Sequence, residues 1–240
     1  MSETLTSLTT SEKVAAVEQL VAAEIAAATG PIAFTNSFQA EDMVLLHIVQ
    51  QRLPDVPVLF LETGYHFAEV LEYRDRMARE WQMNLINIFP AITVAQQESQ
   101  FGILNQSDPT RCCGLRKVQP LFAALESYAV WFTGLRREQA KSRAALKEID
   151  DFPLPSGRSI RKLSPLTEWS AKDVWTYAAQ HNIPLLSLYD KGYTSIGCEP
   201  CTSLPLDPND PRSGRWGGQK LECGIHLPSS SDEAQRSPQQ

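Results

Sequence analysis

Long apolar runs are missing from the sequence, and no stretch approaches the roughly 20 consecutive apolar residues of a membrane-spanning helix. The first residues, MSETLTSLTTSEK, lack the basic segment followed by an apolar one that marks a secretion signal. Basic charge is in deficit, because 28 acidic residues outnumber 22 basic ones and the net charge is −6. We therefore expect a cytoplasmic protein that binds neither membranes nor nucleic acid.

Cysteine is also scarce, and its placement is uneven. The chain has only five cysteines, and because cytoplasmic thiols stay reduced, clustered cysteines indicate a metal site or catalysis. Cys112 and Cys113 are adjacent in TRCCGLRKVQP. Cys198 and Cys201 form a C-x-x-C in SIGCEPCTS, and Cys223 is left over in ECGIH.

The two cysteine pairs favour an iron–sulfur cluster. Structural zinc ligands usually lie two to four residues apart, and adjacent side chains converge poorly on one tetrahedral ion. A 4Fe–4S cubane has separate irons at its corners, so adjacent thiolates can each bind their own iron. A thioredoxin-like C-x-x-C would leave the adjacent pair unexplained, and unligated core cysteines are the third alternative. We predict one 4Fe–4S cluster per chain, bound by Cys112, Cys113, Cys198 and Cys201.

A basic pair follows the adjacent cysteines. On a helix, Arg116 lies four residues after Cys112, and Lys117 lies four residues after Cys113. A 4Fe–4S cluster with four thiolates carries net negative charge, and buried negative charge needs cationic partners. We therefore predict that Arg116 and Lys117 are charge partners of the cluster, the alternative being a solvated surface patch.

Strands alternate with helices along the chain. The pattern predicts strands over residues 31–36, 56–62, 84–89 and 129–134, and helices over 11–29, 40–51, 67–80, 113–127 and 170–181. This alternation is typical of an α/β fold with a mostly parallel sheet flanked by helices. The loops SFQAED, ETGYH and GLRRE follow the first, second and fourth strands. They should meet at one edge of the sheet, where such folds bind ligands.

The C-terminal part has a different composition. From residue 204 onward, Pro, Gly, Ser and charged residues dominate. We expect one α/β domain over residues 1–205, which carries the iron–sulfur site. A mobile segment over residues 206–240 would carry Cys223, and its last dozen residues would be disordered.

Single motifs leave alternatives open. SFQAED stands at a helix start, which favours phosphate or sulfate binding, but a plain N-cap serine with acidic neighbours explains it too. Arg136 and Arg137 could clamp a phosphate, or they could be an exposed pair. Cys223 on a flexible arm is a candidate nucleophile, and a stray surface cysteine explains it equally well.

Together the motifs resemble one family, the assimilatory adenylyl-sulfate reductases, within the group that includes phosphoadenylyl-sulfate reductases. The resemblance runs over about residues 32–226 and rests on SFQAED, LETGYH, CCGLRK, WFTGLRREQ, SPLTEWSAKDVW, YTSIGCEPCT, RSGRW and ECGIH. It implies the adenine nucleotide alpha hydrolase-like α/β fold and, in cysteine biosynthesis, reduction of adenosine 5′-phosphosulfate (APS) to sulfite and AMP. ATP pyrophosphatases of that fold carry an SGG-x-D-S loop where this chain has SFQAED, and this departure argues against ATP cleavage.

The resemblance also implies roles for single residues. Cys223 would attack the sulfur of APS to form a Cys223 S-sulfonate, and reduced thioredoxin or glutaredoxin would then release sulfite. Lys117 would link the cluster and the sulfate, and family precedent implies a homo-oligomer. The implied substrate-binding residues are Ser37, Phe38, Gln39, Leu61, Thr63, Gly64, Lys117, Arg136, Arg137, Arg212, Arg215 and His226.

Three alternative functions remain open. The enzyme could prefer the 3′-phosphorylated substrate PAPS or accept both nucleotides, and Gln39 stands where the family loop more usually has Gly or Ser. A cluster-bearing ATP-dependent sulfur transferase acting on RNA would need the SGG-type loop and a basic surface. An iron–sulfur redox sensor would need neither ECGIH nor the arginines at the strand ends.

Overall fold

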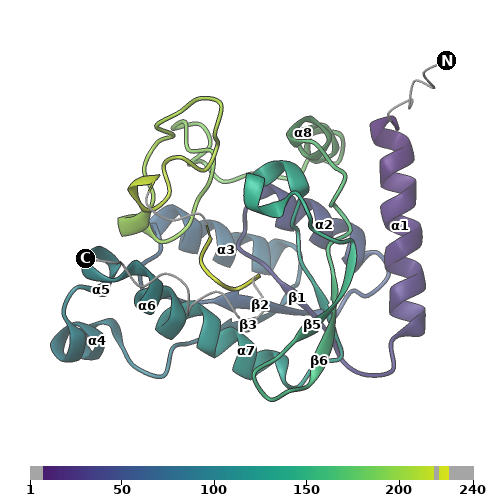
Figure 1. The fold of residues 1–240 in the computed structure, drawn as a ribbon. Helices are drawn as coiled ribbons and strands as arrows, with labels where there is room; N and C mark the ends of the chain where they lie inside the picture. The colour runs from purple at the N-terminus through teal and green to yellow at the C-terminus, as the bar shows by residue number, and fades with distance from the viewer. Residues whose placement is uncertain (1–7, 219–221, 227–240) are drawn as a thin grey trace.

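The computed structural model describes residues 8–218 and 222–226 (Figure 1). In this part of the chain a six-stranded sheet has the order β3-β2-β1-β4-β6-β5. The strands are β1 Ile32–Thr35, β2 Pro57–Leu61, β3 Asn84–Ile88, β4 Val130–Phe132, β5 Ile149–Pro153 and β6 Ser159–Leu163. All neighbours pair in parallel except β5 and β6, which are antiparallel. The mostly parallel sheet is as predicted.

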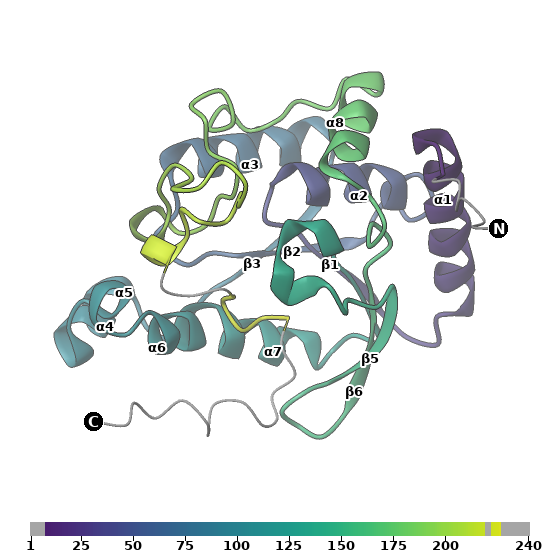
Figure 2. The same ribbon diagram turned by 45° about the horizontal axis from the view of Figure 1, so that its top comes forward.

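Helices cover both faces of the sheet (Figure 2). One face carries α1 Thr10–Ala27, α2 Ala40–Gln50, α3 Ala68–Glu80 and α8 Ala171–Gln180. On the other side lie α4 Val94–Phe101, α5 Leu104–Ser107, α6 Pro109–Cys113 and α7 Gln119–Leu125. Because side chains alternate along a strand, Phe34 and Phe132 pack in one core and Ala33 and Trp131 in the other.

The helix predicted over residues 113–127 begins earlier and is interrupted. It begins at Pro109, because the Asp108 carboxylate accepts a hydrogen bond from the Arg111 amide at 2.9 Å. A π-helical turn, η1 Gly114–Val118, separates α6 from α7. Pro120 has no N–H to donate to the preceding turn, and the wider turn bonds the Gln119 amide to the Gly114 carbonyl instead. The adjacent cysteines therefore end α6.

The β5–β6 hairpin was absent from the predicted elements. Its second strand, SIRKL, contains two adjacent basic residues, yet Ile160, Lys162 and Leu163 are buried there. Pairing of β6 with β4 places the strand inside the sheet, so tertiary context overrides the charged composition.

The strand order turns around between β1 and β4. From β1 the chain runs outward through β2 and β3 on one side. On the other side it passes from β4 to the edge strand β5 and then returns to β6, which lies between β4 and β5. In open α/β sheets such a switch point creates a crevice at the carboxyl ends of the strands, where ligands bind. The loops SFQAED and GLRRE flank this point.

The segment over residues 181–218 covers that edge of the sheet (Figure 1). It contains the short turns η4 Glu199–Cys201 and η5 Trp216–Gly218, and a bridge joins Thr202 to Arg215. The turns η2 Arg137–Gln139 and η3 Lys141–Arg143 follow β4. The predicted division at residue 205 stays a prediction. The last dozen residues, for which we predicted disorder, lie outside the described residues. No described helix is long and apolar enough to cross a membrane.

Candidate active site

A cavity of about 510 Å³ lies at the carboxyl edge of the sheet. The loop after β1 contributes Ser37 and Gln39 to its wall, the loop after β2 contributes Thr63, and the loop after β4 contributes Gly134 and Arg136. The prediction that these loops meet at one edge is therefore confirmed.

The loop after β1 is closed around a carboxylate of its own. Asp42 accepts hydrogen bonds from the Ser37 amide at 2.7 Å, the Ser37 hydroxyl at 2.6 Å and the Gly134 amide at 3.1 Å. Burial raises the pKa of Asp42 to about 6. Phe38 has a left-handed backbone, with φ 62, and its ring is buried against Phe60. The Asp42 carboxylate therefore engages the Ser37 amide and hydroxyl of this loop.

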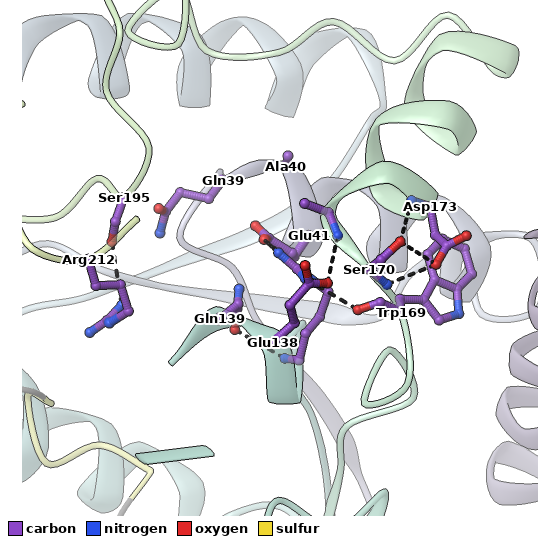
Figure 3. Close-up of polar contacts among 12 residues, drawn as sticks. Gln39, Ala40, Glu41, Glu138, Gln139, Trp169, Ser170, Asp173, Ser195 and Arg212 are labelled. Atoms are coloured by element: carbon purple, nitrogen blue, oxygen red, sulfur yellow. Dashed lines mark hydrogen bonds and ion pairs between the residues drawn. The ribbon is translucent and has the colours of Figure 1, made fainter. Parts of the chain in front are cut away.

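The arginine pair after β4 is divided between the cavity wall and the surface. Arg136 is buried and forms an ion pair with Glu41, with 2.7 Å between Nη2 and Oε1. It also donates to the Trp169 carbonyl at 3.2 Å, and Figure 3 shows Glu41, Glu138 and Trp169 gathered at this end. Arg137 instead pairs with the exposed Glu168. The Arg136 guanidinium is thus already neutralised by carboxylates.

Cations gather elsewhere along the cavity wall. They are Lys117, Arg143, Arg212 and Arg215. Burial would lower the pKa of Lys117, but the charges of Cys198 and other thiols outweigh this effect and raise it. Arg215 packs directly on Gly197, where any Cβ would collide with the guanidinium. Figure 3 shows Arg212 well apart from Glu41 and Glu138. The cavity therefore has an acidic part and a basic part.

The ECGIH segment enters the basic part of the cavity. Cys223, Ile225 and His226 all line it. The His226 ring stacks on Trp131, with 5.6 Å between ring centroids, and the His226 carbonyl accepts from Lys162 Nζ at 3.5 Å. Burial and then the charge of Lys162 hold the pKa of His226 well below its usual range. His226 therefore contributes a neutral imidazole.

The four remaining cysteines line a second, smaller cavity. Cys112 and Cys113 reach it from the end of α6, and Cys198 and Cys201 reach it from the start and end of the η4 turn. Lys117 lines both cavities. The tertiary fold thus brings the two cysteine pairs together beside the larger cavity.

The thiols in this second cavity differ in acidity. Burial would raise the pKa of Cys198, but Lys117 and a hydrogen bond with Thr63, 3.4 Å from Sγ, lower it overall. Burial raises the pKa of Cys112 and of Cys201. Nowhere in the described ranges do three or more Cys, His, Asp or Glu side chains converge as ligands of a single metal ion. An all-thiolate set around a cavity suits a cluster, since each corner iron takes its own ligand.

Most predicted substrate-binding residues line the large cavity. They are Ser37, Gln39, Leu61, Thr63, Lys117, Arg136, Arg212, Arg215 and His226. Phe38 points into the core, Gly64 lies against Val94 and Arg116, and Arg137 faces outward. The roles of these residues stay predictions.

The structure adds residues that sequence reasoning missed. Arg143 lines the cavity and pairs with Glu222, with 2.8 Å between Nε and Oε1. Glu222 directly precedes Cys223 in ECGIH, and this adjacency was a usable signal. Nothing in KSR, the sequence around Arg143, distinguishes this arginine from an exposed one.

Comparisons with known proteins agree on the family. A model of the phosphoadenosine phosphosulfate reductase domain matches residues 31–204. The chain is 44% identical over 202 residues to the adenosine 5′-phosphosulfate reductase of Geobacillus thermodenitrificans, covering 82% of this chain and 83% of the relative. It is 39% identical over 216 residues to the phosphoadenosine 5′-phosphosulfate reductase of Gloeobacter violaceus, covering 88% of each.

The fold has also been seen in a solved structure. The phosphoadenylyl-sulfate reductase from Candida auris, in its phosphate complex, aligns with a TM-score of 0.65 at 22% identity, covering 83% of this chain and 98% of that one. The predicted adenine nucleotide alpha hydrolase-like fold is thereby confirmed.

Proposed function

Because this chain belongs to the phosphoadenosine phosphosulfate reductase family, we propose that it reduces APS to sulfite and AMP with electrons from a thiol reductant. One observation carries the proposal: Cys223 lines the same cavity as the strand-end loops and a group of cations. The setting would be assimilatory sulfate reduction in the cytoplasm, by a homo-oligomer.

The uneven charge of the cavity supports a single orientation for the substrate. The phosphosulfate of APS carries negative charge on both of its groups, so it would bind near Lys117, Arg212 and Arg215. The adenosine would then lie along the loops after β1 and β2. The carboxylate of Asp42 at the start of α2 opposes an anion there, which directs the phosphosulfate toward the thiol.

The first step is nucleophilic attack. The Cys223 thiolate attacks the sulfur of APS, and the bond between that sulfur and the bridging phosphate oxygen breaks. AMP leaves with the bonding electron pair, and a Cys223 S-sulfonate remains. Nearby cations balance the charge that develops on the leaving phosphate. The neutral ring of His226 forms part of the wall of the site.

The second step is reduction. A thiolate of thioredoxin or glutaredoxin attacks the Cys223 sulfur, and sulfite leaves with the electron pair of the broken S–S bond. This forms a mixed disulfide, which the second thiol of the reductant resolves. Two thiols are oxidised to one disulfide while the sulfate sulfur gains two electrons, so the electrons balance without another donor.

We propose one 4Fe–4S cluster per chain at the smaller cavity, because the four thiols that line it are the donor set that such a cluster needs. Its ligands would be Cys112, Cys113, Cys198 and Cys201, which all line that cavity. When bound, such a group would join α6 to the η4 turn and place fixed negative charge beside Lys117. Neither step above takes electrons from it.

The nucleophile can be tested by trapping the intermediate. Incubation of the protein with APS and no reductant should add about 80 Da, one sulfonate, to the peptide that contains Cys223. Reduced thioredoxin should then release sulfite and restore the original mass. Cys223→Ser should form no adduct, and normal adduct formation in that variant would contradict the assignment. A redox sensor without catalysis would form no adduct in the native chain either.

The 3′-phosphorylated nucleotide is the second candidate substrate, and the similarity to the Gloeobacter violaceus relative favours it. Gln39 lines the cavity, donates to the Ser37 hydroxyl at 3.2 Å and accepts from the Ile196 amide at 2.8 Å. It thereby joins the loop after β1 to the loop before Cys198. A competition assay with both nucleotides measures the preference. If the adduct forms faster with PAPS than with APS, PAPS becomes the proposed substrate.

A further inference from the structure

The carboxylate of Glu222 is held firmly beside the thiol of the site. Arg143 binds it with both ends of its guanidinium, at 2.8 Å between Nε and Oε1 and 3.0 Å between Nη2 and Oε2. The Ser142 hydroxyl donates to Oε1 at 3.1 Å. Because the two charged side chains are only 9% and 11% exposed, water competes weakly for this pair.

Neighbouring groups complete the setting of the pair. Arg212 also donates to the Glu222 carboxylate, with 3.4 Å between Nη2 and Oε2. Arg143 Nη1 donates to the Gln139 side chain, which also accepts from the Arg136 amide at 3.1 Å. The guanidinium of Arg143 is thus used to join the ECGIH segment to the turns after β4.

The other side of Cys223 is anchored by packing. Ile225 packs against the core on the α7 side of the sheet, and the His226 ring stacks on Trp131. An ion pair therefore precedes the thiol and an apolar anchor follows it. Two anchors on either side of one residue restrict its position, which is how catalytic groups are held in a productive geometry.

We infer that Glu222 and Arg143 are positioning residues, whose ion pair holds the Cys223 thiol inside the cavity. The inference rests on the proposed function for the role of Cys223. Neither residue needs to touch the reacting atoms. The pair acts by keeping the thiol close to the site of the phosphosulfate.

The test compares Glu222→Gln with a matched control, Glu24→Gln. Glu24 forms a similar two-point pair with Arg161, at 2.6 and 2.9 Å, between α1 and β6. In single-turnover reactions with APS, Glu222→Gln should form the Cys223 adduct at least about tenfold more slowly than the native chain. Iodoacetamide should alkylate Cys223 faster, as measured by peptide mass spectrometry, because the thiol leaves the cavity more often. Glu24→Gln should change neither rate.

A double variant separates positioning from a general loss of charge. If the pair acts as a unit, Arg143→Gln combined with Glu222→Gln should be no slower than the slower single variant. Additive effects of the two substitutions would overturn the inference, and so would native rates of both reactions in Glu222→Gln.

The two proposals fail in different ways. If the native chain forms no adduct at Cys223, the proposed function fails. The alkylation measurement still tests the pair in that case, and equal alkylation of Cys223 in the native and Glu222→Gln chains would overturn the positioning role. Far-ultraviolet circular dichroism checks that each variant is folded.

Discussion

Replacement of Gly134 by alanine should damage the site through steric contact alone. Gly134 follows β4 closely and faces the start of α2. A Cβ there would lie 2.9 Å from both the Asp42 amide nitrogen and the Glu41 carbonyl carbon, and closer still to Asp42 Oδ1. Backbone atoms cannot move aside as a flexible side chain can, so the loop after β4 and the start of α2 must separate.

The size of the effect follows from two contributions. Overpacking of this kind costs about 1–3 kcal/mol, and weakening the 3.1 Å bond from the Gly134 amide to Asp42 costs about 1 kcal/mol more. The sum of about 2–4 kcal/mol corresponds to a fall in Tm of about 4–16 °C for a domain of this size. Because both loops line the cavity, AMP should bind more weakly as well.

Thermal unfolding and calorimetric titration with AMP measure these effects. Gly114→Ala is the matched control, because Gly114 is helical and a Cβ there would meet nothing within 4 Å. That variant should keep the native Tm or exceed it slightly, since alanine restricts the unfolded chain. A Gly134→Ala protein with native Tm and native AMP affinity would refute the close approach of this loop to α2.

Two further predictions concern charge. Lys117→Met should slow adduct formation in single turnover by about 100-fold, because it removes a cation beside the thiols, and a rate close to native would contradict this. Burial would raise the pKa of Asp173, but Lys13, at 2.7 Å, and neighbouring hydroxyls hold it well below its usual value. A depressed carboxyl pKa adds stability above the unfolded pKa that is lost as pH falls through the folded one, so urea unfolding should show native stability falling between about pH 5 and about pH 2. Asp173→Asn should lack that part of the fall, and an identical pH profile would contradict the assignment.

The fold was predictable where local patterns are strong. Alternating strands and helices predicted the parallel sheet and the edge at which its loops meet. The β5–β6 hairpin was missed because Arg161 and Lys162 mask the strand pattern, and burial in the sheet overrides them. The π-helical turn before α7 was missed because its hydrogen bonding depends on how the chain accommodates Pro120.

The site was predictable only in its chemistry. The adjacency of Cys112 and Cys113 could be interpreted without a structure, because it restricts which inorganic centre the thiols suit. The ion-pair partners of the arginines could not be predicted from the sequence. Arg136 looked like a phosphate clamp but pairs with Glu41, and Arg143 looked like any exposed arginine but pairs with Glu222.

The order of amino acids alone specifies the cysteine pairs, the leftover thiol at Cys223 and the alternation that builds the sheet, because spacing and periodicity are properties of the chain. Folding brings both cysteine pairs to one cavity and places Lys117 between that cavity and the larger one. Folding also determines which cations line the larger cavity and which are paired with carboxylates. The effect of a charge depends on its distance from other charges and from water, and those distances exist only in the folded chain.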